Sequence, residues 1–162
     1  NINYNKLENV TAQKLAITDS TETSIPFYAQ KNADNLGLSS IKLNHDIKEY
    51  DLINVSCRTL DSLFLKKDVT RKIIKIDTQG NEFNVLMSGK KIINRDRPII
   101  IFEFESDYFT NPNDEKNTKQ GIMDFFEKMN YELFMIDNNI KFMPKLTLKD
   151  YFQGDIIAVP SK

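Results

Sequence analysis

The chain has 162 residues and is nearly neutral, with 22 lysines and arginines, 23 aspartates and glutamates and a formal net charge of -1. This length suits a single domain over residues 1–162, and the balanced charge provides no basic surface for nucleic-acid binding. The lone cysteine excludes an internal disulfide, and no apolar run approaches the roughly 20 residues of a membrane span. The first residues show no signal pattern, so we expect a cytoplasmic α/β domain.

The first third of the chain favours short strands. An apolar run predicts a strand over 10–17, and a second run over 24–29 contains Pro26, which favours an edge position because proline cannot donate to a ladder. Residues 51–59 alternate in polarity, as is typical of a half-solvated strand. We therefore expect a small β excursion between Ala29 and Thr59, beside a main sheet.

The centre of the chain favours strands that alternate with helices. Thr59 predicts the N-cap of a short helix over 60–66. A strand is expected over 72–77, and a helix is expected to open near 81–82. The run 99–104 is almost continuously apolar, a pattern typical of strands buried on both faces of a parallel sheet.

The last third predicts a helix over 120–129 and strands over 131–136 and 155–159, with 140–143 as a possible hairpin partner. Residues 108–119 are polar and rich in turn formers, so we expect a loop there. The strand–helix alternation indicates βαβ crossovers and a mostly parallel sheet. Because no long helix separates the last two strands, we expect an antiparallel carboxyl-terminal edge.

Two of the expected parallel strands end in acids. Asp77 closes one strand and Glu103 nearly closes the next. Ligands of open parallel sheets bind outside the carboxyl ends of the strands, and alternate side chains share a face, as Lys75 and Asp77 do. If the two strands are neighbours in register, Lys75, Asp77 and Glu103 form one charged cluster. We expect Lys75 to be a charge partner of the carboxylates rather than a base.

The turn after Asp77 contains Gly80 and leads to Glu82. Glycine allows a sharp turn or a close approach of the backbone to a ligand. Glu82 falls in the first turn of the following helix, where its negative charge is favourable. A capping role and a functional role are equally compatible with that position.

The sequence contains few signals for metal binding, nucleophilic catalysis or phosphate binding. His45 and Cys57 are far apart in sequence, so we expect no zinc site and no Cys–His nucleophile. No glycine-rich phosphate loop and no Gly-x-Ser-x-Gly motif occurs. Asp77 and Glu103 could instead hold a divalent cation, which is the weaker reading, and we expect no metal.

The stretch Ile74-Lys-Ile-Asp-Thr-Gln-Gly-Asn-Glu82, followed by Val85-Leu86 and Gly89, resembles the FkbM-type methyltransferases, whose characteristic stretch is roughly Ile-Lys-Ile-Asp-x-x-Gly-x-Glu. Weaker matches extend over nearly the whole chain. The resemblance implies a class I methyltransferase fold, which is Rossmann-like, with a seven-stranded sheet and helices on both faces. It also implies S-adenosylmethionine as the cofactor.

The implied reaction is methyl transfer to a hydroxyl oxygen of a sugar, a polysaccharide unit or a secondary metabolite, so the expected partner is a small-molecule or glycan acceptor. The glycine loop after the family's first strand and the acid after its second strand are absent. We therefore expect a partial methyltransferase domain with its amino-terminal strands missing. The strand near Val10 would then expose an unpaired edge, which favours association. The sequence leaves the oligomeric state open.

The resemblance also assigns roles by position. Ala16 and Asp19 follow the family's third strand, where the adenine edge is contacted, and Asp77 and Gly80 lie where the sulfonium end is bound.

For the chemistry, the resemblance points to Asp77 or Glu103 as the base, with Glu82 orienting the acceptor and Lys75 tuning the carboxylates. The alternative is a truncated or degenerate noncatalytic domain, which keeps the sheet and serves binding or interaction.

Overall fold

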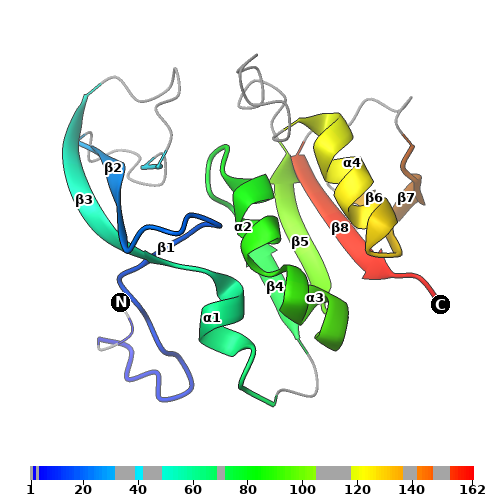
Figure 1. Ribbon diagram of the computed structural model, residues 1–162, viewed down its shortest axis with the longest axis horizontal. Helices are drawn as coiled ribbons and strands as arrows, with labels where there is room; N and C mark the ends of the chain where they lie inside the picture. The colour runs from blue at the N-terminus through cyan, green and yellow to red at the C-terminus, as the bar shows by residue number, and fades with distance from the viewer. Residues whose placement is uncertain are drawn as a thin grey trace.

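The computed structural model describes most of the chain as two sheets and four short helices (Figure 1). The described residues are 2, 4–31, 39–41, 49–68, 72–104, 118–136, 142–147 and 154–162. His45 and most of the predicted loop over 108–119 lie outside these ranges. No helix in the described part is long and apolar enough to cross a membrane.

The smaller sheet has the strand order β1-β3-β2 and contains β1 (Ala16–Ile17), β2 (Ser24–Gln30) and β3 (Tyr50–Arg58). β1 runs parallel to β3, and β2 runs antiparallel to it. The predicted β excursion is confirmed, and Pro26 does lie on an edge strand.

The strand predicted over 10–17 is wrong for most of its length, because only Ala16 and Ile17 are extended and paired. Ile17 packs against the hydrophobic core, whereas residues 10–14 are exposed. Exposed residues gain no burial that would offset the entropy lost on ordering them as a strand. The expected unpaired edge near Val10 is therefore not present.

The larger sheet has the order β4-β5-β8-β6-β7, with β4 (Ile73–Ile76), β5 (Ile99–Phe104), β6 (Tyr131–Ile136), β7 (Phe142–Lys145) and β8 (Gly154–Pro160). β4 and β5 are parallel, and β8 is antiparallel to both β5 and β6. β4, β5 and β6 thus run in one direction, as the crossovers predicted, and β7 forms the expected hairpin with β6.

The last two predicted strands are antiparallel, as expected, because β8 pairs with β6, but β8 does not lie at the edge of the sheet. β8 lies inside the sheet, between β5 and β6, so most neighbouring strands of the described sheet are antiparallel rather than parallel. The burial of β8 gives a reason for this place, because Ile156, Ile157 and Ala158 are all buried. A strand with so many apolar residues gains most from an interior position.

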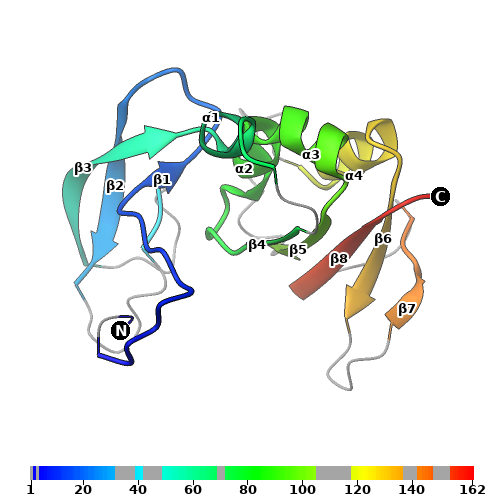
Figure 2. The same cartoon turned by 90° about the horizontal axis from the view of Figure 1, so that it is seen from below.

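The helices α1 (Leu60–Phe64), α2 (Glu82–Ser88), α3 (Lys90–Asp96) and α4 (Lys119–Lys128) lie on one side of β4 and β5 (Figure 2). Their apolar side chains form the core with the inward side chains of the sheet. Phe102 stacks on Phe126 of α4 with ring centroids 5.4 Å apart.

The expectation of helices on both faces is not met by the described residues. β5 alternates, with Ile100, Phe102 and Phe104 buried and Ile99 37% exposed. The continuous apolar run of β5 therefore reflects one face in the core and one apolar face that the described helices leave open.

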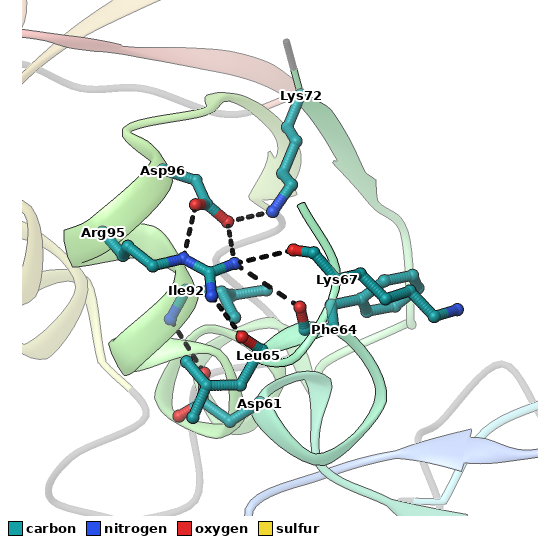
Figure 3. A network of polar contacts seen from close by, with 8 residues as sticks. All are labelled: Asp61, Phe64, Leu65, Lys67, Lys72, Ile92, Arg95 and Asp96. Carbon is teal, nitrogen blue, oxygen red and sulfur yellow. Dashed lines mark hydrogen bonds and ion pairs between the residues drawn. The ribbon is translucent and has the colours of Figure 1, made fainter. Parts of the chain in front are cut away.

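Helix α3 was not predicted, because its N-cap is Gly89, which has no side chain to mark the start of a helix. The cap comes instead from α1, where the Asp61 carboxylate accepts hydrogen bonds from the N–H groups of Lys91 and Ile92 at 3.1 and 2.9 Å (Figure 3). In return, Arg95 of α3 donates to backbone carbonyls at the end of α1 and just beyond it, those of Phe64, Leu65 and Lys67. The two short helices stabilise each other's ends.

The N-cap predicted at Thr59 is confirmed, since its hydroxyl accepts a hydrogen bond from Ser62 N–H at 3.0 Å. Helix α1 ends two residues before the predicted boundary of 60–66. Thr118 caps α4 in the same way, accepting from Gly121 N–H at 3.0 Å.

Candidate functional site at the ends of two parallel strands

The two acid-tipped strands lie side by side and parallel, as predicted. In the ladder between β4 and β5, Lys75 is opposite Ile101 and Ile76 is opposite Phe102. Continuing this register by one residue places Asp77 beside Glu103. The carboxyl ends of both strands lie at the same end of the larger sheet (Figure 1). The sequence argument that these carboxylates share one edge is therefore confirmed at the level of the strands.

The side chain of Gln79 connects the two carboxylates. Its Nε2 lies 3.0 Å from Asp77 Oδ1 and 3.2 Å from Glu103 Oε2. A primary amide has two N–H donors, so one nitrogen can serve both acceptors at once. The carboxylates of β4 and β5 are thereby held in one polar cluster.

Lys75 and Asp155 extend this cluster across the open face of the sheet. Lys75 Nζ lies 3.4 Å from Asp77 Oδ2 and 3.6 Å from Asp155 Oδ1. Asp155 of β8 is also the partner of Glu103 in the strand ladder. The side chains of Lys75, Asp77 and Asp155 are each about half exposed, so these ion pairs are solvated and contribute little to stability. Lys75 is thus a charge partner of the acids.

Glu82 has a different environment from the other acids. It is only 2% exposed, and its carboxylate accepts hydrogen bonds from the N–H and hydroxyl of Thr78 and the N–H of Gly80, at 2.9 to 3.3 Å. These contacts hold the loop between β4 and α2 in place. The sequence position of Glu82 left a capping role and a functional role open, and its hydrogen bonds in the structure are those of a residue that shapes this loop.

The loop itself has an unusual backbone. Gln79 has φ 54° and Gly80 has φ 98°. The left-handed region is easy for glycine but costs of order 1–3 kcal/mol for other residues, and such strain is found often at functional sites. The sharp turn predicted at Gly80 is present, with the strained residue just before it.

Two contacts connect the smaller sheet to this loop. Ser40 Oγ donates to the carbonyls of Thr78 and Gln79 at 3.3 and 3.2 Å, and Asn81 Nδ2 donates to Ile17 O at 3.1 Å. Ile17 lies between the two other residues assigned to cofactor binding. Ala16 precedes it in β1, and Asp19 follows with an exposed side chain.

No group of three or more His, Cys, Asp or Glu in the described part of the chain is arranged to hold a metal ion. Asp77, Glu103 and Asp155 lie near one another, but Gln79 and Lys75 donate to them. The divalent-cation alternative for Asp77 and Glu103 gains no support from the described residues.

The sequence argument missed the residues that connect the acids. Gln79 was part of the turn, and its amide gave no separate signal. Asp155 could have been found, because it starts the predicted last strand, but its pairing with Glu103 depends on the interior position of β8. Ser40 and Asn81 act across long sequence separations, which a local pattern does not show.

Comparison with known proteins gives one family. A family model described as the methyltransferase FkbM domain matches residues 1–133. No curated protein and no solved structure matches the chain. The family match contains β4, the loop with Gln79 and Gly80, and β5 with Glu103, so the whole polar cluster except Asp155 lies within it. The chain therefore belongs to the family of FkbM methyltransferase domains.

Proposed function

We propose that the chain is part of an S-adenosylmethionine-dependent O-methyltransferase, whose acceptor is a hydroxyl of a sugar, a polysaccharide unit or a secondary metabolite. The supporting observation is the Gln79 bridge, which keeps Asp77 and Glu103 adjacent at the carboxyl ends of two parallel strands. Open α/β sheets bind their ligands at this edge.

One of the two carboxylates is the general base in this proposal. The oxygen–methyl bond would form as the methyl–sulfur bond of the cofactor breaks, with S-adenosylhomocysteine as the leaving group, and a carboxylate within hydrogen-bond reach would take the O–H proton of the acceptor. Asp77 is 48% exposed in its side chain, so an acceptor can reach it from solvent. General base catalysis contributes typically 10²–10⁴-fold, and positioning of the acceptor contributes more.

The residues present offer acceptors that suit the cofactor's donor groups. S-Adenosylmethionine contains an ammonium group, ribose hydroxyls and an adenine amine, and Asp19 and Asp77 supply exposed carboxylates that could bind them. Ala16 and Gly80 would shape the same region, because Asn81, next to Gly80, donates to the carbonyl of Ile17, next to Ala16. When bound, the cofactor supplies an activated methyl group.

The remaining roles follow from the contacts. Lys75 is the charge partner of Asp77, because its ammonium nitrogen lies 3.4 Å from Asp77 Oδ2. Glu82 orients the acceptor indirectly, because it holds the loop from which Asp77 and Gln79 project.

The direct test is transfer of labelled methyl from S-adenosylmethionine by the full chain to a panel of mono- and oligosaccharides and hydroxylated small molecules. Asp77→Asn and Glu103→Gln are compared with Glu127→Gln, an exposed acid on α4. We expect a loss of about 10²–10⁴-fold for whichever of the two removes the base, and wild-type rates for the control.

Near wild-type transfer in both Asp77→Asn and Glu103→Gln would remove the two carboxylates from any essential role. A wild-type chain that transfers no methyl to any acceptor would instead favour the alternative of a noncatalytic binding domain.

A further inference from the structure

We propose that Gln79 is a positioning residue that sets the spacing of Asp77 and Glu103 and donates one amide proton to each. The contacts at 3.0 and 3.2 Å come from a single nitrogen, and its two acceptors are Asp77, directly after β4, and Glu103 in β5. The catalytic consequence rests on the proposed function, whereas the bridge itself does not.

The backbone supports this assignment independently. Gln79 occupies the left-handed region at φ 54°, where a residue with a side chain is strained. Contacts on both sides hold it there, because Ser40 donates to the carbonyls of Thr78 and Gln79 and the Glu82 carboxylate accepts from Thr78 and Gly80. A buried acid and a segment from the other sheet therefore stabilise a loop shape that directs this amide at both carboxylates.

The side chains around Gln79 favour a donor at this position. Asp77 and Glu103 both accept hydrogen bonds when ionised, and so does Asp155 beside Glu103. Lys75 is the cation among them, and it contacts Asp77 and Asp155. The Gln79 amide supplies a neutral donor between Asp77 and Glu103, whereas a carboxylate at this position would place a third acceptor against them.

The first test observes the bridge without any reaction. The side-chain amide of Gln79 is recorded in ¹H–¹⁵N correlation spectra of the full chain and assigned by its loss in Gln79→Gly. We expect both amide protons to shift as the pH is lowered from 6 to 3 and their acceptors take up protons. The pH dependence of one proton should be lost in Asp77→Asn and that of the other in Glu103→Gln. Amide protons that do not respond to pH, or that both follow a single carboxylate, would overturn the proposal.

The second test uses folding stability. In Gln79→Glu the new carboxylate faces Asp77 and Glu103. The other charged side chains nearby are Lys75 and Asp155 on the open face of the sheet and Glu82 across the loop. The neighbouring acids should raise the pKa of the new carboxyl group in the folded state above its value in the unfolded chain. The variant should therefore match the stability of the wild type near pH 4 and lose stability as the pH rises to 7. We expect a relative loss of about three- to fivefold in the folding equilibrium constant. A difference from wild type that stays constant with pH would contradict the bridge.

The third test separates positioning from folding. Gln79→Gly removes the amide and relieves the left-handed strain, and Asn130→Gly is the matched control because Asn130 has φ 57° far from the site. We expect urea midpoints close to wild type for both, with methyl transfer reduced about tenfold in kcat for Gln79→Gly alone. Wild-type kcat in Gln79→Gly would overturn the positioning role.

An absence of transfer in the wild type would refute the proposed function, while the amide spectra would still show whether Gln79 bridges the two carboxylates.

Discussion

Glu82 shows how one buried acid determines the shape of the candidate site. Its carboxylate accepts from two backbone N–H groups and one hydroxyl, all of them within four residues. A carboxylate is compatible with a buried position only when its oxygens are satisfied, as they are here. The loop that presents Gln79 therefore depends on a residue that does not itself reach the open face.

We predict that Glu82→Gln lowers the free energy of unfolding by roughly 2–3 kcal/mol, because an amide nitrogen replaces an acceptor oxygen opposite N–H donors. Urea unfolding monitored by circular dichroism measures this, with Glu127→Gln on the exposed side of α4 as the control. An unchanged midpoint in Glu82→Gln would show that the loop does not need the carboxylate.

A second polar network lies between α3 and the start of β4 (Figure 3). In it, Asp96 contacts both Arg95 and Lys72. The Arg95 guanidinium, at 2.6 Å, and the Lys72 ammonium lower the pKa of Asp96 from 3.8 to about 2. A folded-state pKa below the unfolded value gives stability that is present above about pH 4 and is lost as the pH falls towards 2.

We therefore predict that Asp96→Asn is destabilised at pH 7 by about 1 kcal/mol, after allowance for solvent screening of the partly exposed Arg95. The variant should also lose less stability than the wild type between pH 4 and 2. Thermal unfolding across this pH range measures both effects, and Asp19→Asn serves as an exposed control. Parallel stability curves for Asp96→Asn and wild type would contradict the assigned cause.

At the scale of elements, local patterns predicted most helices and strands but not their order in space. The Thr59 cap and the acid after β4 have local causes, and the structure contains both. The alternation predicted in β3 is present only in its second half, where Val55 and Cys57 are less exposed than their neighbours. Helix α3 and the interior place of β8 have distant causes, namely a cap from Asp61 and pairing with two strands. A pattern read along the chain does not contain these partners.

The same distinction applies to the candidate site. The strand-end acids were predictable because parallel neighbours bring equivalent ends together. The Gln79 bridge depends on a left-handed backbone that contacts from Ser40 and Glu82 maintain. Only the folded arrangement shows that the amide reaches both carboxylates.

At the scale of the whole molecule, the larger sheet has one face covered by helices and one face without them in the described residues (Figure 2). β4 is the outer strand of this sheet on one side, with Ile73 71% exposed and Ile99 37% exposed beside it. No other strand of the described residues pairs with the outer side of β4, and an apolar edge of this kind favours association between chains. We therefore expect β4, rather than the segment near Val10, to mediate self-association.

We predict that Ile73→Lys lowers self-association of the chain without loss of stability, since a charged side chain on an edge strand opposes pairing. Light scattering coupled to size exclusion measures the effect. Val10→Lys is the control, because Val10 is 42% exposed and lies outside the strands. If self-association falls in Val10→Lys and persists in Ile73→Lys, the associating surface is not the edge of β4.

The central claim is that Asp77 and Glu103 act as one unit in methyl transfer. The most direct measurement is a double-mutant cycle in kcat/KM with Asp77→Asn, Glu103→Gln and the double variant, using labelled S-adenosylmethionine and an acceptor that the wild type methylates. Residues that share one function give non-additive losses, so the double variant should lose little more than the more damaging single variant. Fully additive losses would contradict the claim that these carboxylates form a single site.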